Sequence, residues 1–342
     1  MKKNFNFKKA AAAAIVAAGV AGFSATVSAE EYVKIMGTGD EVLGAYPAAS
    51  VSYIEFTEDY IPGLEDIKSV EIALSDNVKF KMIKVEGGVD YTLTKMGTAL
   101  TGTAWTDGKA TKRVEDFWIG EFEVTQGVWK NVMGVTDSKL PKSSDSTPKA
   151  QSAIGNDYPI ANVSWDNIST GTDCFLVKIN ARLKELKESD PVLAAVLGDK
   201  EFRLPNEWEW EYAAAGGKDY ADLNYYYSGT PESTAAALQE VAVNSVSPNT
   251  ATSVAKVGTK APNALGLYDM SGNVWEWCSG LGYPGYESTP GFLSDSGTWS
   301  STYLPYRGGC WNATQTSNFR LSYRNYNTTT IRSTGLGFRL AL

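Results

Sequence analysis

The sequence predicts a mixed α+β fold with a low content of regular secondary structure. Short segments such as 51–57 and 78–85 alternate apolar and polar residues, which is typical of half-buried strands. Three stretches, 125–134, one within 166–188 and 206–217, have the apolar spacing or the end signals of helices. The other segments are irregular and rich in glycine, and all ten tryptophans follow residue 100. Large aromatic side chains can build the core of such a domain.

Residues 30–78 are predicted to form a small β-rich appendage. Their strand-like segments are separated by the turn signals Pro62-Gly63 and Ser75-Asp76-Asn77. The composition changes near Lys79, so we expect the main domain to span residues 79–342.

Two of the predicted helices have specific signals. In the second, an apolar stripe recurs at spacings of four, four and three residues: Phe175, Ile179, Leu183 and Leu186. In the third, Asn206 is the expected N-cap, acidic residues occupy the first turn, and Gly216-Gly217 end the helix. Glu207 and Glu211 lie one turn apart on this helix, and we interpret them as packing residues that Arg203 can pair, rather than as an acid/base pair.

Residues 1–29 predict an export signal. A lysine-rich start precedes an apolar run from Ala10 to Phe23 and small residues that end at Ala29. The run is shorter than the ~20 residues of a spanning helix. We therefore expect cleavage after Ala29 and a periplasmic or secreted product without membrane insertion. Cleavage removes four lysines and changes the formal charge from −8 to −12, which argues against a nucleic-acid partner and suits cation binding.

The chain has no histidine and three cysteines. The missing histidine excludes a Ser-His-Asp triad and histidine-ligated zinc or iron. We expect either a disulfide between Cys278 and Cys310, which lie on strand-like segments, or three buried free thiols. Cys174 lies on a helical pattern and is expected to be buried.

Six motifs follow one another in the second part of the chain: WIGEFEVTQGVW (118–129), YPIANVSWDN (158–167), FRLPNEWEWEYAA (202–214), GLYDMSGNVWEW (266–277), RGGCWN (307–312) and GLGFRLAL (335–342). In this order and spacing they resemble the sulfatase-modifying-factor, or formylglycine-generating-enzyme, family over roughly residues 79–342. The resemblance implies a C-type-lectin-like fold with a twisted antiparallel sheet formed late in the chain.

The resemblance also implies which activity is missing. Enzymes of this family use two cysteines shortly after the Arg-Gly-Gly segment to bind copper and oxidise a substrate cysteine. Ala313 and Asn318 occupy those places here, and neither is a thiolate ligand. Cys310 is a single thiol, which without histidine makes a poor copper site. We expect no copper, no catalytic residue and no oxidase activity.

A calcium site is the second implied feature. The family's ligands correspond to the side chains of Asp269 and Glu276 and to the backbone carbonyls of Gly272 and Val274. Calcium takes about six to eight hard oxygen ligands, which a tight glycine turn can present. The alternative is that Asp269 caps a turn and Glu276 pairs with an arginine such as Arg307 or Arg339.

The segment 311–334 has the most unusual composition in the chain. Fifteen of its 24 residues are Asn, Thr, Ser or Tyr, and none is acidic. Such residues are typical of protein-binding surfaces, although an ordinary polar surface is the alternative. Phe319 and Leu321 are expected in the core. The expected ligand-binding residues are Trp311, Asn312, Gln315, Tyr323, Asn325, Tyr326, Asn327 and Thr328.

Three functional hypotheses follow. The first is an exported, non-catalytic binding protein whose calcium-stabilised lectin-like scaffold presents 311–334 to a protein or glycan. The second is an enzyme or maturation factor of the same family with unidentified chemistry. The third is a variable protein of a diversity-generating retroelement, because those proteins use this fold and end in a similar GFRLA-type tail.

Overall fold

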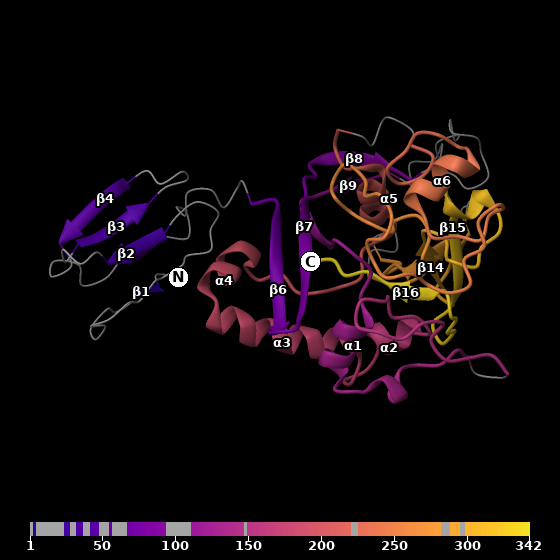
Figure 1. Ribbon diagram of the computed structural model, residues 1–342, viewed down its shortest axis with the longest axis horizontal. Helices are drawn as coiled ribbons and strands as arrows, with labels where there is room; N and C mark the ends of the chain where they lie inside the picture. The colour runs from indigo at the N-terminus through magenta and orange to yellow at the C-terminus, as the bar shows by residue number, and fades with distance from the viewer. Residues whose placement is uncertain are drawn as a thin grey trace. The chain divides into compact units, whose positions relative to one another are not determined.

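The computed structural model describes residues 67–342 apart from 94–110, 147–148, 220–224, 282–287 and 295–297, together with five short strands before residue 67. The chain divides into two compact units, Met1–Lys68 with Lys184–Lys200, and Ser69–Leu183 with Glu201–Leu342 (Figure 1). Within the described ranges, no helix is both long and apolar enough to cross a membrane.

The smaller unit consists mainly of short antiparallel strands. β2 (Ser24–Val27), β3 (Tyr32–Met36) and β4 (Val42–Pro47) form one sheet, and β1 (Lys3–Asn4) pairs with β5 (Glu55–Phe56). Helix α4 (Pro191–Leu197) also belongs to this unit and starts with proline after the N-cap Asp190. Of segment 51–57, only β5 is described. Most of residues 1–29 lie outside the described residues, and export stays a prediction.

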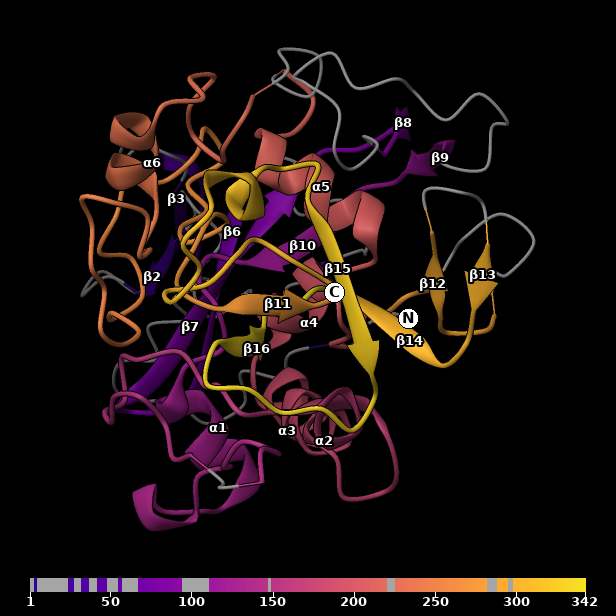
Figure 2. The same cartoon turned by 90° about the vertical axis from the view of Figure 1, so that its right-hand side faces the viewer.

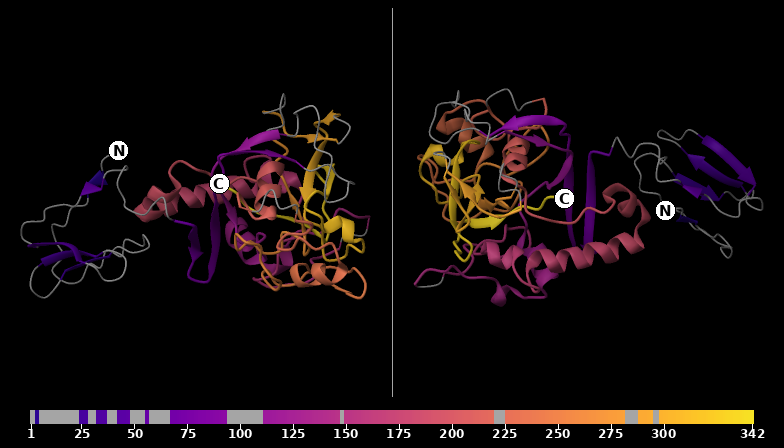
Figure 3. Two further views of the ribbon diagram at one scale, coloured as in Figure 1. Left: turned by 90° about the horizontal axis from the view of Figure 1, so that it is seen from above. Right: turned by 180° about the vertical axis from the view of Figure 1, so that it is seen from behind.

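The boundary between the units lies earlier than the sequence pattern predicts. β6 (Ser69–Ser75) and β7 (Val78–Val85) form an antiparallel hairpin, seen from behind in Figure 3, whose turn contains Asp76 and Asn77. β7 also pairs with β10 (Phe117–Gly120). A boundary at residue 78 would cut this hairpin. Ile72 and Leu74 are buried, so β6 contributes to the core of the larger unit.

A four-stranded sheet forms late in the chain, as the family resemblance implies (Figure 2). Its strands, in spatial order, are β15 (Arg324–Thr328), β14 (Tyr303–Arg307), β11 (Trp275–Trp277) and β16 (Leu336–Phe338). The pairs β15–β14 and β14–β11 are antiparallel, and the pair β11–β16 is parallel. Two smaller ribbons pair β8 (Val89–Thr92) with β9 (Thr111–Val114) and β12 (Phe292–Leu293) with β13 (Trp299–Ser300).

The predicted helices 125–134 and 206–217 are present with the expected ends, and the segment 166–188 contains two helices. The described α-helices of the larger unit are α1 (Gln126–Met133), α2 (Trp165–Ser169), α3 (Phe175–Ser189, which continues into the smaller unit), α5 (Glu207–Ala215) and α6 (Ala235–Val241). Asn206 caps α5, and Glu209 completes a capping box, while Gly216 ends the helix in the left-handed conformation. Arg203 pairs with Glu209, with Nη1 2.6 Å from Oε2, rather than with Glu207 or Glu211.

Aromatic side chains build the core, as predicted. Trp129 stacks on Phe175 with ring centroids 5.2 Å apart, and Phe338 packs edge-on against both rings. Trp208 and Trp210 of α5 are fully buried. Of the α3 stripe, the first three members are buried, and Leu186 is only partly buried.

Candidate functional site

The register of the four-stranded sheet gathers charged side chains on one face. Glu276 lies opposite Arg307, and Arg307 lies opposite Arg324. Residues in register point to the same face of a sheet, so these three side chains share one face. We call it the charged face.

The opposite face carries the immediate neighbours of those residues. Trp277 lies opposite Tyr306, and Tyr306 lies opposite Asn325. Because successive side chains of a strand alternate between faces, these three point away from the charged face. We call this the aromatic face.

Helix α5 covers the charged face with a neutral cluster of two carboxylates and two guanidinium groups: Glu207, Glu211, Arg307 and Arg324, all buried. Glu207 accepts from Arg307 Nε at 2.7 Å and from Arg324 Nη2 at 2.6 Å. Arg307 Nη2 lies 2.9 Å from Glu211 Oε2. Burial opposes ionisation of Glu207, but Arg324 and Arg307 outweigh it and hold its pKa below the ordinary value. Both carboxylates are occupied by arginine, as the packing interpretation predicts.

A second buried cluster has an excess of negative charge. It contains Glu123, Asp269, Glu276 and Arg339, and we call it the acidic cluster. Arg339 donates from Nη2 to Glu276 Oε1 at 2.8 Å and from Nε to Oε2 at 3.0 Å. Trp210 Nε1 donates to the same carboxylate at 2.7 Å. The arginine pairing considered as the alternative for Glu276 is therefore present.

The two remaining carboxylates of the acidic cluster have no arginine of their own. Asp269 Oδ2 accepts from the Gly258 N–H at 2.7 Å, and its Oδ1 is buried without a hydrogen-bond partner. Glu123 accepts from the Val274 N–H at 2.9 Å and from Asn273 Nδ2 at 2.7 Å. Burial raises the pKa of Asp269 to about 6. Burial, then Asp269 and Glu276, raise the pKa of Glu123 well above its ordinary value.

A tight turn links Asp269 to Glu276. Asp269, Gly272 and Asn273 all have positive φ, at 59°, 101° and 55°. At Gly272 an added Cβ would lie 2.6 Å from the Val243 carbonyl oxygen, so only glycine fits. The turn therefore has the predicted glycine geometry.

Two features of this turn suit a bound cation: an unpartnered oxygen of Asp269 and the number of buried carboxylates around it. Within the described residues, no three His, Cys, Asp or Glu side chains form a metal-binding group. A cation here would thus depend on backbone carbonyls, as the resemblance implies. The orphaned Asp269 Oδ1 is a hard oxygen donor, and three buried carboxylates share the guanidinium of Arg339. These features suit a divalent cation.

Packed aromatic rings form the aromatic face. Tyr306 lies edge-on to Trp275 with ring centroids 5.3 Å apart, and Tyr323 is tilted against Trp275 with centroids 5.8 Å apart. Burial raises the pKa of Tyr306 to about 12, and its hydroxyl hydrogen-bonds with Asn327. Tyr323, Asn325 and Asn327 are half-buried at the edge of this face, and we call them the rim.

The eight predicted ligand-binding residues do not form one surface. Tyr326 and Thr328 alternate with the rim and so point to the charged-face side, where Tyr326 stacks on Phe292 at 4.4 Å. Asn312 and Gln315 are exposed, and Trp311 is half-buried with its Nε1 bonded to the Thr334 carbonyl. Phe319 and Leu321 are buried, as predicted.

All three cysteines are buried free thiols, which is the second of the two predicted alternatives, and Cys278 and Cys310 are not joined by a disulfide. The reason is register: the Cys278 N–H bonds to the Pro305 carbonyl, which places Pro305 rather than Cys310 beside it. Cys310 instead donates its thiol to Asn312 Oδ1 at 2.9 Å. Burial raises the pKa of Cys310 to about 12.

The two positions matched to the catalytic cysteines lie in the loop after β14. Ala313 packs against a buried cluster that includes Phe319. The Asn318 N–H bonds to the Gln315 carbonyl at the start of a short 3₁₀ helix, Thr316–Phe319. Neither side chain can bind a soft metal ion.

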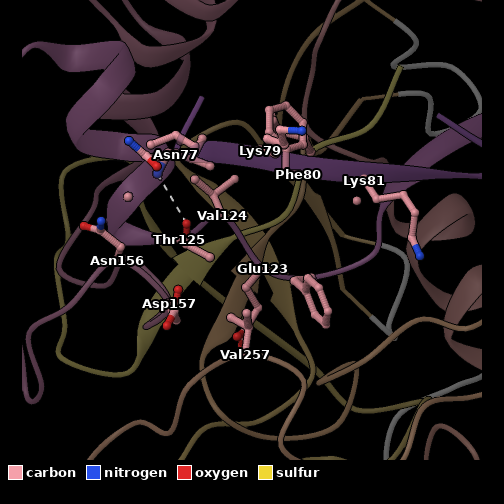
Figure 4. A pocket seen from close by; sticks show the side chains of 16 residues that line it. Asn77, Lys79, Phe80, Lys81, Glu123, Val124, Thr125, Asn156, Asp157 and Val257 are labelled. Carbon is pink, nitrogen blue, oxygen red and sulfur yellow. Dashed lines mark hydrogen bonds between the residues drawn. The ribbon is translucent and has the colours of Figure 1, made fainter. Parts of the chain in front are cut away.

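Glu123 also lines a pocket of about 200 Å³. The pocket lies between the start of β7 and the segment that leads into α1, and Val257 forms part of its wall (Figure 4). Val257 precedes Gly258, the hydrogen-bond donor to Asp269. The sequence analysis did not select Glu123, although this acid lies within the 118–129 motif beside the apolar Val124.

Comparison with known proteins decides the family. Residues 76–342 match the model of the sulfatase-modifying factor enzyme 1-like domain. The chain belongs to this family. The matched range begins in the β6–β7 turn and covers the sheet, both clusters and the segment 311–334.

Relatives of the sulfatase-modifying-factor family differ in function. The chaperone protein LppX of Paenibacillus barcinonensis is 29% identical over 219 residues, which is 58% of this chain and 70% of the relative. The formylglycine-generating enzyme of Streptomyces coelicolor is 33% identical over 155 residues, and that of Thermomonospora curvata is 31% identical over 147. These matches cover 41% of this chain and 46% and 48% of the enzymes.

Solved structures confirm the fold. Treponema denticola variable protein 1 aligns with a TM-score of 0.55 and 24% identity, over 80% of this chain and 98% of that protein. PvdO from Pseudomonas aeruginosa aligns with a TM-score of 0.53 and 19% identity, over 80% and 97%. The mixed α+β, C-type-lectin-like fold of the formylglycine-generating-enzyme type is thereby established.

Proposed function

We propose that this protein is an exported, non-catalytic binding protein. Its lectin-like scaffold, stabilised by calcium, presents part of segment 311–334 to a protein or glycan ligand. The observation that carries the proposal is the division of the late sheet. The charged face is covered by α5 at Arg307 and Arg324, and the rim residues on the aromatic face remain partly exposed.

The chemistry around the rim favours binding over oxidation. Ala313 and Asn318 have no thiol, and the chain has no histidine. Cys310 is buried and its raised pKa keeps it protonated at neutral pH, so it is a weak nucleophile and a weak metal ligand. Tyrosine and asparagine, by contrast, supply rigid contact area and adaptable hydrogen bonds.

Calcium has a structural role in this proposal. Asp269 and Glu276, with the carbonyls of Gly272 and Val274, would hold the ion. When bound, calcium supplies two positive charges that offset the excess of the acidic cluster. The chain's own residues fix the turn that carries these ligands, and the turn packs against β14 through the Gly272 N–H and the Gly308 carbonyl, 2.8 Å apart. The expected result of binding is a more stable scaffold.

A binding screen tests the rim. Fluorescently labelled residues 30–342 are applied to a printed glycan array and to a phage-displayed peptide library, with calcium present. For a ligand found in either screen, Tyr323→Ala and Asn325→Ala should each weaken binding by about 1–2 kcal/mol. Tyr326→Ala is the matched control on the same strand, because its ring lies on the other face and should leave affinity unchanged. Equal binding by the Tyr323→Ala, Asn325→Ala double variant would reject the rim.

Two alternatives have specific support. The similarity to LppX favours a maturation factor that binds a client protein, and a protein hit without any glycan hit would be in line with it. The likeness to the Treponema variable protein favours a diversified protein. An imperfect DNA repeat of the codons for 311–334 beside a reverse-transcriptase gene would support that reading.

A further inference from the structure

We infer that Glu123 is a positioning residue of the cation site: it holds the Asn273–Val274 peptide in place through hydrogen bonds to the Val274 N–H and to Asn273 Nδ2. The inference rests on the proposed calcium role and extends it, because the expected ligands do not include Glu123. Glu123 lies about 150 residues away from the turn in sequence.

The geometry separates Glu123 from the expected ligands. One oxygen accepts the Val274 N–H at 2.9 Å, and the other accepts Asn273 Nδ2 at 2.7 Å. Both contacts fall on the turn that would present the Val274 carbonyl to the ion. Glu123 thus orients the ligand-bearing peptide without having to touch the cation.

Asn273 is held on both sides. Its Nδ2 donates to Glu123, and its Oδ1 accepts the Ala255 N–H at 3.0 Å. Since both ends of the amide are used, Asn273 cannot rotate to accommodate a donor in place of Glu123. Its positive φ of 55° further restricts it.

Charge is the second contribution. Glu123 is buried beside Asp269 and Glu276, and Arg339 is the cation that faces all three. Without Glu123, two buried carboxylates rather than three would share Arg339, and the Val274 N–H and Asn273 Nδ2 would lose their acceptor. We therefore expect the affinity for a divalent ion to fall by about tenfold or more.

The test is isothermal calorimetry of calcium binding to the mature chain and two variants. Glu123→Gln removes the charge and sets a donor against Asn273 Nδ2, and we expect affinity to fall about tenfold or more. The double variant Glu123→Gln, Asn273→Asp restores one hydrogen bond and the total charge, because the new amide can donate to the new carboxylate. Aspartate tolerates positive φ. We expect the double variant to regain affinity to within about threefold of wild type.

Each outcome decides a different point. If wild type binds calcium and Glu123→Gln binds it equally well, the role of Glu123 is wrong and the calcium site stands. If Glu123→Gln binds calcium weakly and the double variant does not regain affinity, then restoring the hydrogen bond between positions 123 and 273 is not sufficient. The inference fails in that case too. If wild type itself shows no binding heat and no melting shift with calcium, the proposed calcium role fails. Circular dichroism of all three proteins in chelator identifies any variant that does not fold.

Discussion

Arg339 holds the carboxylate of Glu276 with two nitrogens, at 2.8 and 3.0 Å, and both side chains are buried. The same guanidinium donates to the backbone carbonyls of Gly120, Glu121 and Tyr268. Arg339 therefore connects the segment after β16 to β11, to the end of β10 and to Tyr268, which precedes Asp269.

Removing Arg339 should be costly. Arg339→Met leaves three buried carboxylates without a cation and removes one donor from each of three carbonyls, so we expect the free energy of unfolding to fall by about 3–5 kcal/mol. Urea denaturation at neutral pH measures this free energy of unfolding. Arg203→Met is the control, because Arg203 is about 41% exposed in its pair with Glu209 and should contribute about 1 kcal/mol or less. Equal losses in the two variants would contradict the account of the cluster.

Glu207 should titrate at lower pH in the folded protein than in the unfolded chain. Its pKa is held down by Arg324 and Arg307, whereas an unfolded glutamate titrates near ~4.3. A lowered native pKa means that this group stabilises the fold above the unfolded pKa and loses that contribution as pH falls through the native pKa. Carbon-13 NMR of the Glu207 carboxyl, in the native protein and in urea, measures both midpoints. A native midpoint equal to or above the unfolded one would disagree with the pairing.

The three thiols should be unreactive in the native state. They are buried, and the pKa of Cys310 is raised to about 12, so few thiolates exist at pH 8. Iodoacetamide should label none of them before unfolding and all three afterwards, as counted by intact mass spectrometry. Rapid native labelling, or a non-reduced mass lower by two hydrogens, would show that the thiols are accessible or oxidised.

The absence of oxidase chemistry is also testable. With copper and a sulfatase-derived peptide that contains cysteine, we expect no conversion of that cysteine, because Ala313 and Asn318 supply no thiolate pair. Mass spectrometry of the peptide is the readout, and a formylglycine-generating enzyme serves as positive control. Measurable conversion would overturn the non-catalytic reading.

Local signals in the sequence predicted the elements well. The alternation in 78–85 and 273–278 marked β7 and β11, and Asn206 and Gly216 marked the ends of α5. The same alternation places Tyr323 and Tyr326 on opposite sides of β15. The change of composition near Lys79 predicts a domain boundary there, but composition does not reveal that the strands on either side of the Asp76-Asn77 turn pair with each other.

Long-range features were not predictable in the same way. The contact of Glu123 with Asn273 and Val274 joins two motifs that only the fold brings together. Glu276 pairs with Arg339 rather than with Arg307, because Arg307 already binds Glu207 of α5. The sequence left open whether Cys278 and Cys310 form a disulfide or stay free, and the strand register decides it by placing Pro305 beside Cys278.

The melting temperature of the mature chain with calcium and with chelator tests the acidic cluster most directly. At calcium about 100-fold above the dissociation constant, we expect a stabilisation of about 2.7 kcal/mol, which corresponds to a rise of about 5 °C or more. Asp269→Ala removes the buried oxygen that has no protein partner and should abolish the rise. A wild-type protein whose melting temperature is the same in calcium and in chelator would contradict the calcium-stabilised scaffold.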